Sequence, residues 1–362
     1  MIRLGYQNDT IMNKLNNRQL NILEMMKLDS FSSSGVFSLI KQKEKISLVT
    51  IKRDLEFLFK NEYLKREGKG RSVIYCKTIK GLLFSPVSIS DFNNQEPDKR
   101  DGMNLFNFSL FKEFPKNIFS EEEMKILSSV TSEYKKKTKD LKGIVYIKEL
   151  ERFIIELSWK SSEIEGNTYT LLDTERLIKD GIPAKGHSKN EATMILNHKK
   201  AFSFILENLK LLKNNNLTLP FIEKVHELIV KDLDIRYGIR NRLVGIVGTK
   251  YKPLDNKYQI KESLELLLSL INKMNDSYNK ALTFLVGFSY IQPFEDGNKR
   301  TSRLLCNAIL LLNNCAPLSY RSVNEKEYRE SILVFYEMNS IISMKKIFIE
   351  QYLFSANNYS IS

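Results

Sequence analysis

Apolar residues recur every three to four positions along most of the chain, and this spacing predicts helices that bury one face. In the first 80 residues the spacing predicts three helices, at 14–30, 36–43 and 47–60. Residues 65–78 instead hold two short apolar runs around Gly68-Lys69-Gly70, which predicts a two-stranded hairpin with a basic tip. The pattern therefore predicts one small domain over residues 1–80.

The third predicted helix, 47–60, opens at Ser47, a residue type that commonly caps helix N-termini. Its inward side is expected to consist of Val49, Leu55, Leu58 and Phe59. Its opposite side carries Thr50, Lys52 and Arg53. Three helices followed by a basic hairpin resemble the winged helix-turn-helix domain of bacterial regulators.

That resemblance implies DNA binding, with residues 47–60 in a major groove and with Lys69 and Arg71 on phosphates or in the minor groove. The charge agrees with this, because residues 1–80 hold sixteen Lys and Arg against eight Asp and Glu. The whole chain carries a net charge of +13. The same domain type also serves for dimerisation or protein contact, so DNA binding and a homodimer both stay open.

Helical periodicity fades between residues 81 and 118, where a polar stretch at 93–104 contains Pro and Gly, so a linker is expected there. Residues 119–358 are predicted to form a second domain, all-helical except for a short β-hairpin at 238–253. Its first helices are expected at 120–141, 144–166, 170–180, 189–213 and 219–233. The predicted fold class is mainly α.

The composition narrows the class of protein further. A chain of 362 residues that is 42% apolar can bury one or two cores. No apolar run approaches the roughly 18 residues of a membrane span, and the N-terminus has no apolar signal core, so no membrane partner is expected. Three cysteines without metal spacing make no disulfide framework, and we therefore expect a cytoplasmic protein.

The residues best suited to chemistry lie between Gly287 and Arg303. A helical apolar run there meets Pro293, which should end the helix, and an acidic turn follows. A second helix opens with Arg300 and Arg303, whose three-residue spacing places both guanidinium groups on one side of its first turn. The positive end of a helix favours phosphate, and Asp296 beside it is a natural magnesium ligand. These residues alone predict a magnesium–nucleotide site.

The same stretch resembles the signature of the Fic family, His-x-Phe-x-Asp/Glu-Gly-Asn-Gly/Lys-Arg-x-x-Arg. The matching positions are Phe294, Asp296, Gly297, Asn298, Lys299, Arg300 and Arg303. The resemblance implies transfer of AMP from ATP, with Mg²⁺, to a Ser, Thr or Tyr hydroxyl of a target protein.

The resemblance also implies a role for each residue of the signature. Asp296 would hold the magnesium, and Gly297 and Asn298 would line the anion site. Arg300 and Arg303 would bind the terminal phosphates. Lys299 stands where glycine is more usual, which leaves open whether the transferred group is AMP or another phosphate-containing group.

The first position of the signature departs from the family, because Gln292 replaces the histidine that accepts the proton of the target hydroxyl. An amide side chain cannot act as a base near neutral pH, and loss of a general base costs about a hundred- to ten-thousand-fold in rate. Gln292 is either the natural residue of a nucleotide-sensing pseudoenzyme coupled to a DNA-binding domain, or a substitution that silences an enzyme.

A second motif precedes the signature. Ser161, Glu165 and Gly166 end a predicted helix, and taken alone they read as an ordinary helix end with a glycine cap. Beside the Fic signature they resemble the family's inhibitory pattern, Ser/Thr-x-x-x-Glu-Gly/Asn. That resemblance implies that Glu165 pairs with Arg303 and takes the place of the γ-phosphate of the nucleotide.

The predicted hairpin at 238–253 is open to two interpretations, an ordinary surface hairpin or the Fic flap that pairs with the backbone of the target protein. Its tip consists of Ile246, Val247, Gly248 and Thr249. By the same resemblance, the adenine would be walled by Tyr328, Tyr336 and Asn339. His198 and His226 are expected to pack within helices, and His187 is expected in an exposed loop.

Overall fold

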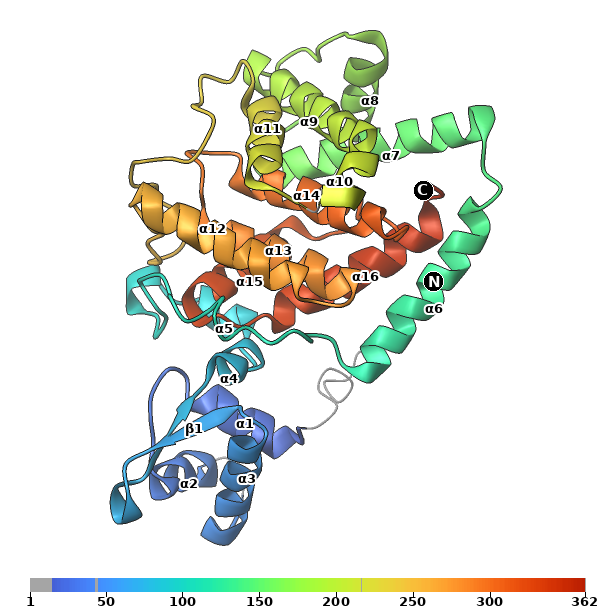
Figure 1. Ribbon diagram of the computed structural model, residues 1–362. Helices are drawn as coiled ribbons and strands as arrows, with labels where there is room; N and C mark the ends of the chain where they lie inside the picture. The colour runs from blue at the N-terminus through green and yellow to red at the C-terminus, as the bar shows by residue number, and fades with distance from the viewer. Residues whose placement is uncertain (1–14, 43–44, 216, 362) are drawn as a thin grey trace. The chain divides into compact units, whose positions relative to one another are not determined.

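A computed structural model describes residues 15–42, 45–215 and 217–361. The protein is mainly helical, as predicted, and the described residues hold one sheet, which has two strands (Figure 1). The chain divides into two compact units. The first unit comprises Met1–Met124, Ile246–Lys252 and Glu330–Met344, and the second comprises Lys125–Gly245, Pro253–Arg329 and Lys345–Ser362.

The three helices and the hairpin predicted in the first 80 residues are all formed. They are α1 (Asn17–Met25), α2 (Ser33–Lys41), α3 (Leu48–Lys60), β1 (Leu64–Glu67) and β2 (Ile74–Lys77). The strands pair antiparallel, from Leu64 opposite Lys77 to Glu67 opposite Ile74. The helices bury one shared apolar cluster that includes Ile22, Leu23, Val36, Ile40, Ile51, Leu55 and Leu58.

Helix α3 is capped as predicted, because the Ser47 hydroxyl accepts a hydrogen bond from the Thr50 N–H at 3.2 Å. Its buried stripe differs from the prediction. Ile51 is fully buried, whereas Val49 is 60% exposed. Val49 lies two residues before Ile51, about 200° around the helix, and therefore faces away from the core. Phe59 is also exposed rather than buried.

The segment predicted as a linker, 81–118, is more ordered than its composition suggests. It holds α5 (Ile89–Asn93) and a 3-10 turn at Pro97–Lys99, and it follows directly on α4 (Ile79–Leu83). Its buried aromatic residues are Phe84, Phe92, Phe106, Phe111 and Phe114. Their irregular spacing hid this burial from a search for helical periodicity.

The second unit is built from helices. They are α7 (Gly143–Glu163), α8 (Leu171–Asp180), α9 (Lys189–Glu207), α10 (Leu209–Asn215), α11 (Leu219–Val230), α12 (Lys257–Asn272), α13 (Ser277–Ile291) and α14 (Asn298–Leu312). Helices α13 and α14 are buried along almost their whole length, and they form the centre of this unit. Within the described ranges, no helix is both long enough and apolar enough to span a bilayer.

Three further helices contribute residues to both units. They are α6 (Glu121–Thr138), α15 (Glu325–Met338) and α16 (Ile342–Asn358). The predicted capping box of α6 is formed, since the Glu123 carboxylate accepts from the Ser120 N–H at 2.7 Å and the Ser120 hydroxyl accepts from the Glu123 N–H at 3.2 Å.

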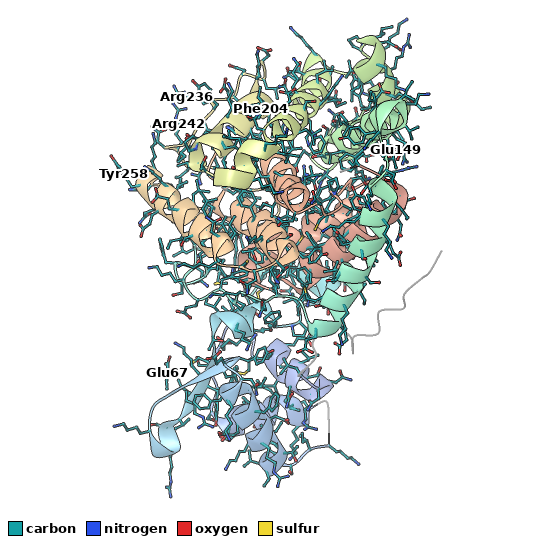
Figure 2. The ribbon with its side chains drawn as sticks, turned by 45° about the vertical axis from the view of Figure 1, so that its right-hand side comes forward. Glu67, Glu149, Phe204, Arg236, Arg242 and Tyr258 are labelled. Atoms are coloured by element: carbon teal, nitrogen blue, oxygen red, sulfur yellow. The ribbon has the colours of Figure 1, made fainter. Side chains whose placement is uncertain are left out.

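The hairpin predicted at 238–253 is not formed, because no strand is assigned in this stretch. The backbone groups that would pair within a hairpin bond elsewhere. Arg240 N–H donates to the Pro293 carbonyl at 3.0 Å, and Lys252 N–H donates to the Asn104 carbonyl at 2.9 Å. The loop before residue 246 instead presents exposed side chains, among them Arg236 and Arg242 (Figure 2).

We predict that Ile51→Ala lowers the free energy of unfolding of the N-terminal helices by about 2–5 kcal/mol, because it leaves a cavity in their shared core. Val49→Ala on the same helix should change it by about 0.5 kcal/mol or less, since that side chain faces solvent. Hydrogen exchange of the α3 amides in the full chain measures both effects. Equal losses in the two variants would contradict the observed facing of α3.

Candidate functional site

The site is built on the turn between α13 and α14. Helix α13 ends at Gln292, whose φ of 50° is left-handed, and Pro293 cannot continue the helix. The turn is closed by Asn298: its amide oxygen accepts from the Phe294 N–H at 2.9 Å, and its amide nitrogen donates to the Phe294 carbonyl at 2.8 Å. This reciprocal pair fixes the start of α14.

Gly297 is required at the N-terminus of α14. Its φ is +76°, a conformation that residues with a side chain rarely adopt. A Cβ at this position would also lie 3.2 Å from Ile229 and 3.3 Å from Val230. No side chain caps the helix at Gly297. The partial positive charge at the N-terminus of α14 is therefore available to attract a negatively charged group.

His226, on α11, contacts two residues of the turn. Its ring stacks on Phe294 with centroids 3.7 Å apart, and its Nε2–H donates to the Asp296 carbonyl at 2.9 Å. Burial lowers the pKa of His226 to about 4, so the ring is neutral at physiological pH. The packing role predicted for this histidine fits, but its contact with the motif was not foreseen.

Arg303 is completely buried and is held by the end of α7. Its Nη2 lies 2.9 Å from Glu165 Oε1, its Nε donates to the Ser161 hydroxyl at 2.9 Å, and Nη2 donates to the Ser161 carbonyl at 2.8 Å. The other oxygen of Glu165 lies 3.6 Å from Lys299 Nζ. We call Glu165, Arg303 and Lys299 the latch.

The carboxyl group of Glu165 is strongly held in its charged form. Burial by itself would raise its pKa, but the positive charges of Arg303, Lys299 and Arg300 outweigh burial and lower the pKa to about 2. The side chain is only 19% exposed, so solvent screens these interactions little. The latch is therefore charged at any physiological pH.

Arg300 and Asp296 form the other half of the site. Arg300 Nη2 lies 3.2 Å from Asp296 Oδ2, and Asp296 Oδ1 accepts from the Gly297 N–H at 2.5 Å. Arg300 is buried, whereas the Asp296 side chain is 64% exposed and is open to a ligand. The turn thus sets a solvent-exposed carboxylate beside the buried Arg300.

These residues fit a nucleotide phosphate. Arg300 Nη1 and Arg303 Nη1 are buried, and neither has a hydrogen-bond partner among the described residues. Two buried unsatisfied guanidinium donors at the open N-terminus of a helix are suited to an oxyanion. Magnesium fits less completely, since no group of three or more His, Cys, Asp and Glu in the described ranges could hold a metal. It would depend on Asp296 and the phosphate oxygens together.

Gln292 is 7% exposed and is turned back on its own helix. Its side-chain amide nitrogen donates to the Ser289 carbonyl at 2.6 Å. Its main-chain carbonyl accepts from Arg240 Nε at 2.7 Å. The backbone at the position of the family histidine is therefore firmly held, while the side chain there has no proton-accepting nitrogen.

The end of α7 is anchored on both sides of Glu165. Before it, Arg329 Nε donates to the Ile164 carbonyl at 2.6 Å. After it, Gly166 has a φ of +95°, the left-handed conformation expected of its position. No sequence pattern pointed to Arg329, which binds the carbonyl at this helix end from a distant part of the chain.

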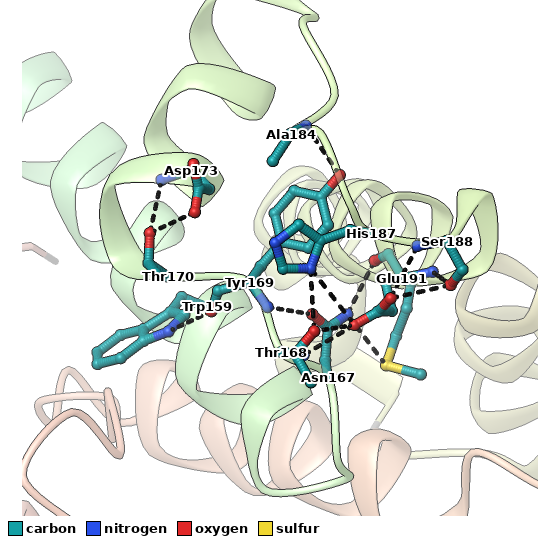
Figure 3. A network of polar contacts seen from close by, with 11 residues as sticks. Trp159, Asn167, Thr168, Tyr169, Thr170, Asp173, Ala184, His187, Ser188 and Glu191 are labelled. Atoms are coloured by element: carbon teal, nitrogen blue, oxygen red, sulfur yellow. Dashed lines mark hydrogen bonds and ion pairs between the residues drawn. The ribbon is translucent and has the colours of Figure 1, made fainter.

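Beyond Gly166, a polar network ties the chain to the start of α9 (Figure 3). Glu191 accepts from the Thr168 N–H at 2.9 Å and from its hydroxyl at 2.6 Å, and hydrogen bonds from Thr168 and Ser188 lower the pKa of Glu191 to about 2. His187, predicted to be exposed, is half-buried: it contacts Thr168 Oγ1 at 2.9 Å, and its ring lies against the Tyr169 ring at a tilt of 49°, with centroids 4.4 Å apart. The loop that carries His187 is partly buried because Thr168 and Tyr169 contact the His187 ring.

The residues predicted to wall the adenine are buried but do not all belong to one unit. Tyr328 lies in the second unit, with the Arg303 guanidinium 5.7 Å from its ring centroid. Tyr336 and Asn339 lie in the first unit, where Tyr336 packs on Tyr251 and Asn339 accepts from Asn107 at 2.9 Å. Their contact with a nucleotide stays a prediction.

The remaining predicted residues lie in the first unit. Val247, at the predicted loop tip with Ile246, Gly248 and Thr249, is 97% exposed. Of the residues predicted to bind DNA, Lys52, Arg53, Lys69 and Arg71 are exposed, while Thr50 is half-buried in the α3 cap. The structure leaves these basic side chains accessible.

The sequence model of the Fic/DOC family matches residues 216–310, which include the whole turn between α13 and α14. This stretch is therefore similar in sequence to the Fic domain. A protein adenylyltransferase fic-1 of Caenorhabditis elegans is 25% identical over 174 residues, which are 47% of this chain and 34% of that protein. A protein adenylyltransferase Fic of Nematostella vectensis is 27% identical over 180 residues, 48% of this chain and 41% of that protein.

Solved structures of Fic proteins share the fold of this chain over about two thirds of its length. Fic-1 (residues 134–508) from C. elegans superposes with a TM-score of 0.57 at 21% identity, over 66% of this chain and 72% of that one. A Fic domain-containing signalling protein from Bacteroides thetaiotaomicron gives 0.53 at 21% identity, over 64% and 94%. The chain spans well under half the length of the two full-length relatives named above.

The latch predicts a specific pH dependence of stability. The pKa of Glu165 is about 2 in the folded protein and near 4.5 in the unfolded chain, so the unfolded chain takes up the proton first as the pH falls. The stabilisation should be complete above about pH 5 and should fade between pH 4.5 and 2, by roughly 3 kcal/mol in total.

The measurement compares the chain with Glu165→Gln by urea denaturation at several pH values. The single tryptophan, Trp159, lies on α7 within two residues of Ser161 and reports unfolding of the second unit by fluorescence. Taking the difference between the two proteins cancels other titrating groups such as His226. A difference that stays constant down to pH 2 would contradict the latch.

Proposed function

We propose that this protein is a Fic-type protein adenylyltransferase that Glu165 inhibits from within the same chain. The observation that carries the proposal is the pairing of Glu165 with Arg303 beside two buried arginine nitrogens that lack hydrogen-bond partners. This is the arrangement of an anion site whose occupant is partly replaced by a carboxylate of the protein. The adenylyltransferase names of its relatives support the choice of reaction.

In the proposed reaction, ATP supplies AMP: the target hydroxyl oxygen bonds to the α-phosphorus, and the bond to pyrophosphate breaks. Arg300 and Arg303 would hold the β- and γ-phosphates through the donors that are unsatisfied here. Asp296 would hold Mg²⁺, and the open end of α14 at Gly297 and Asn298 would stabilise negative charge on the phosphates. Lys299 adds a further cation beside Arg300 and Arg303. It leaves open which phosphate-containing group is transferred.

Self-inhibition follows from competition for the same donors. Glu165 neutralises Arg303 and approaches Lys299, so a γ-phosphate that uses these cations has to displace the carboxylate. The anchors at Arg329 and Thr168 hold the segment on either side of Glu165 and oppose its release. A latch held at both ends should keep the resting activity low.

Gln292 sets a second limit, because no base is present to take the proton of the target hydroxyl. Restoring histidine should be tolerated, since the backbone there is fixed by bonds of main-chain atoms to Phe288 and Arg240. As written, the chain should bind the nucleotide weakly and transfer the group slowly or not at all.

We predict that Gln292→His with Glu165→Gly transfers label from α-labelled ATP to protein at least a hundredfold faster than the chain as given. Gln292→His alone should stay slow, because the latch remains closed. The measurement is label incorporation into proteins of a bacterial lysate and into the chain itself, resolved on a gel.

Asp296→Ala in the double variant is the matched control, and it should abolish transfer while leaving Arg303 and Lys299 in place. If no variant incorporates label although ATP binding is measurable, the enzyme interpretation is contradicted. It would leave a protein that senses nucleotides without transferring them.

A DNA-binding regulator is the second candidate, in which the Fic domain only binds nucleotide. It is favoured by the exposed basic side chains at Lys52, Arg53, Lys69 and Arg71, on a helix and a hairpin tip in the order of a winged helix. Phosphate contacts by such side chains make DNA affinity depend steeply on salt. The two functions can coexist in one chain.

For this candidate we predict that the full chain retards a DNA duplex on a gel, with an affinity that falls as salt rises. Lys69→Ala with Arg71→Ala should reduce the slope of log affinity against log salt by about two. Lys261→Ala, an exposed lysine of α12, should leave the slope unchanged. A chain that dimerises but retards no DNA would favour the dimerisation interpretation instead.

A further inference from the structure

The loop 246–252 belongs to the first unit, where segments distant in sequence hold it. Lys252 N–H donates to the Asn104 carbonyl at 2.9 Å, and a parallel bridge joins Lys252 to Leu105. Met103 N–H donates to the Glu337 carbonyl of α15 at 2.7 Å. The loop, the segment before residue 105 and the end of α15 therefore form one body.

At the centre of this body lies a buried ion pair. Arg100 Nη1 is 3.0 Å from Glu337 Oε1, and the two side chains are 5% and 0% exposed. Arg100 also donates from Nε to the Gln95 carbonyl at 3.1 Å and lies over the Phe92 ring. Contacts outside loop 246–252 therefore already hold Arg100 and its partner Glu337 in place.

Each partner of the pair also holds the loop directly. Arg100 Nη1 donates to the Gly248 carbonyl at 2.8 Å. Glu337 Oε1 accepts from the Thr249 hydroxyl at 2.7 Å. Lys250 Nζ reaches back to donate to the Arg100 carbonyl. Successive residues 248, 249 and 250 are therefore all bound to one buried charge pair, which we call the clamp.

A buried ion pair such as the clamp contributes little net stability to a fold. Taking two charges out of water costs several kcal/mol each, and an apolar pair of the same size often stabilises a protein as well or better. What an ion pair provides here is direction, because it orients a carbonyl and a hydroxyl of the loop. Next to the clamped Gly248, Val247 remains 97% exposed.

We propose that Arg100 and Glu337 are positioning residues that fix loop 246–252 for contact with an extended segment of the target protein. This inference rests on the proposed transferase function and extends it. It assigns the presentation of the target-binding loop to residues of the first unit, including one from the stretch predicted as a linker. An exposed loop held rigid at its base loses less entropy when a strand of a partner pairs with it.

The test uses the Gln292→His, Glu165→Gly chain as background and adds one change at a time. Arg100→Ala removes the cation of the clamp. Gly102→Ala disturbs the clamp without unpairing a charge, because a Cβ there would lie 2.6 Å from the Glu337 side chain. Lys99→Ala is the matched control, since Lys99 is exposed and pairs at the surface with Glu96.

Two measurements are made on each full-length variant. Hydrogen exchange of the Met103 and Lys252 amides reports whether the loop is clamped and does not depend on catalysis. Label transfer from ATP to proteins of a bacterial lysate, with the KM for ATP taken separately, reports presentation of the target.

We expect both clamp variants to exchange these amides at least tenfold faster and to lose at least tenfold in transfer, with the KM for ATP unchanged. The control should match the background in every measurement. Faster exchange with undiminished transfer would overturn the inference, because the clamp would then be structural only. Unchanged exchange would overturn it as well. A background that shows the clamped exchange but transfers no label would overturn the proposed function and, with it, the role of the clamp in transfer.

Discussion

The second unit depends on how one buried charge is compensated. Arg303 has no exposed surface, and its guanidinium contacts Ser161 and Glu165 at a helix end far away in sequence, while its Nη1 has no hydrogen-bond partner among the described residues. Removing one partner of such a pair typically costs about 3–5 kcal/mol, because the other charge is left without compensation. Any anion that enters the site has to meet this same need. In the proposed function, the charge that pairs with Glu165 is therefore also the charge that would receive the ligand.

This constraint links the contact between Glu165 and Arg303 to the stability of the fold. A chain without the Glu165 carboxylate keeps the buried arginine but loses its counter-ion, so it should depend more on a bound anion to stay folded. Lys299 adds to the effect, because its amine lies 3.6 Å from the same carboxylate. The surrounding anchors, Arg329 on one side and Thr168 with Glu191 on the other, make the helix end a stable place to hold a competing charge.

Parts of the fold and site that depend on contiguous residues could be predicted well from the sequence. The N-cap at Ser47, the break at Pro293 and the two arginines of α14 follow from local rules of helix geometry. Pairings across long separations could not be derived in this way. Glu165 and Arg303 were paired only through a family resemblance, while Arg100 with Glu337 and Arg329 with Ile164 had no sequence signal. The hairpin prediction at 238–253 was wrong because turn residues do not reveal that the backbone bonds to partners elsewhere.

The left-handed backbone at Gln292 restricts which residues can stand at this position of the turn. Only a few per cent of residues other than glycine adopt a positive φ, and branching at Cβ makes that conformation a genuine outlier. Valine, isoleucine or threonine there would distort the turn that carries Asp296 and Asn298, and the whole phosphate site would be lost with the base. Glutamine is unbranched at Cβ and lets the turn survive. Under the proposed function, only a narrow set of residues could therefore replace the family's histidine and keep the turn intact, and a single substitution separates glutamine from histidine.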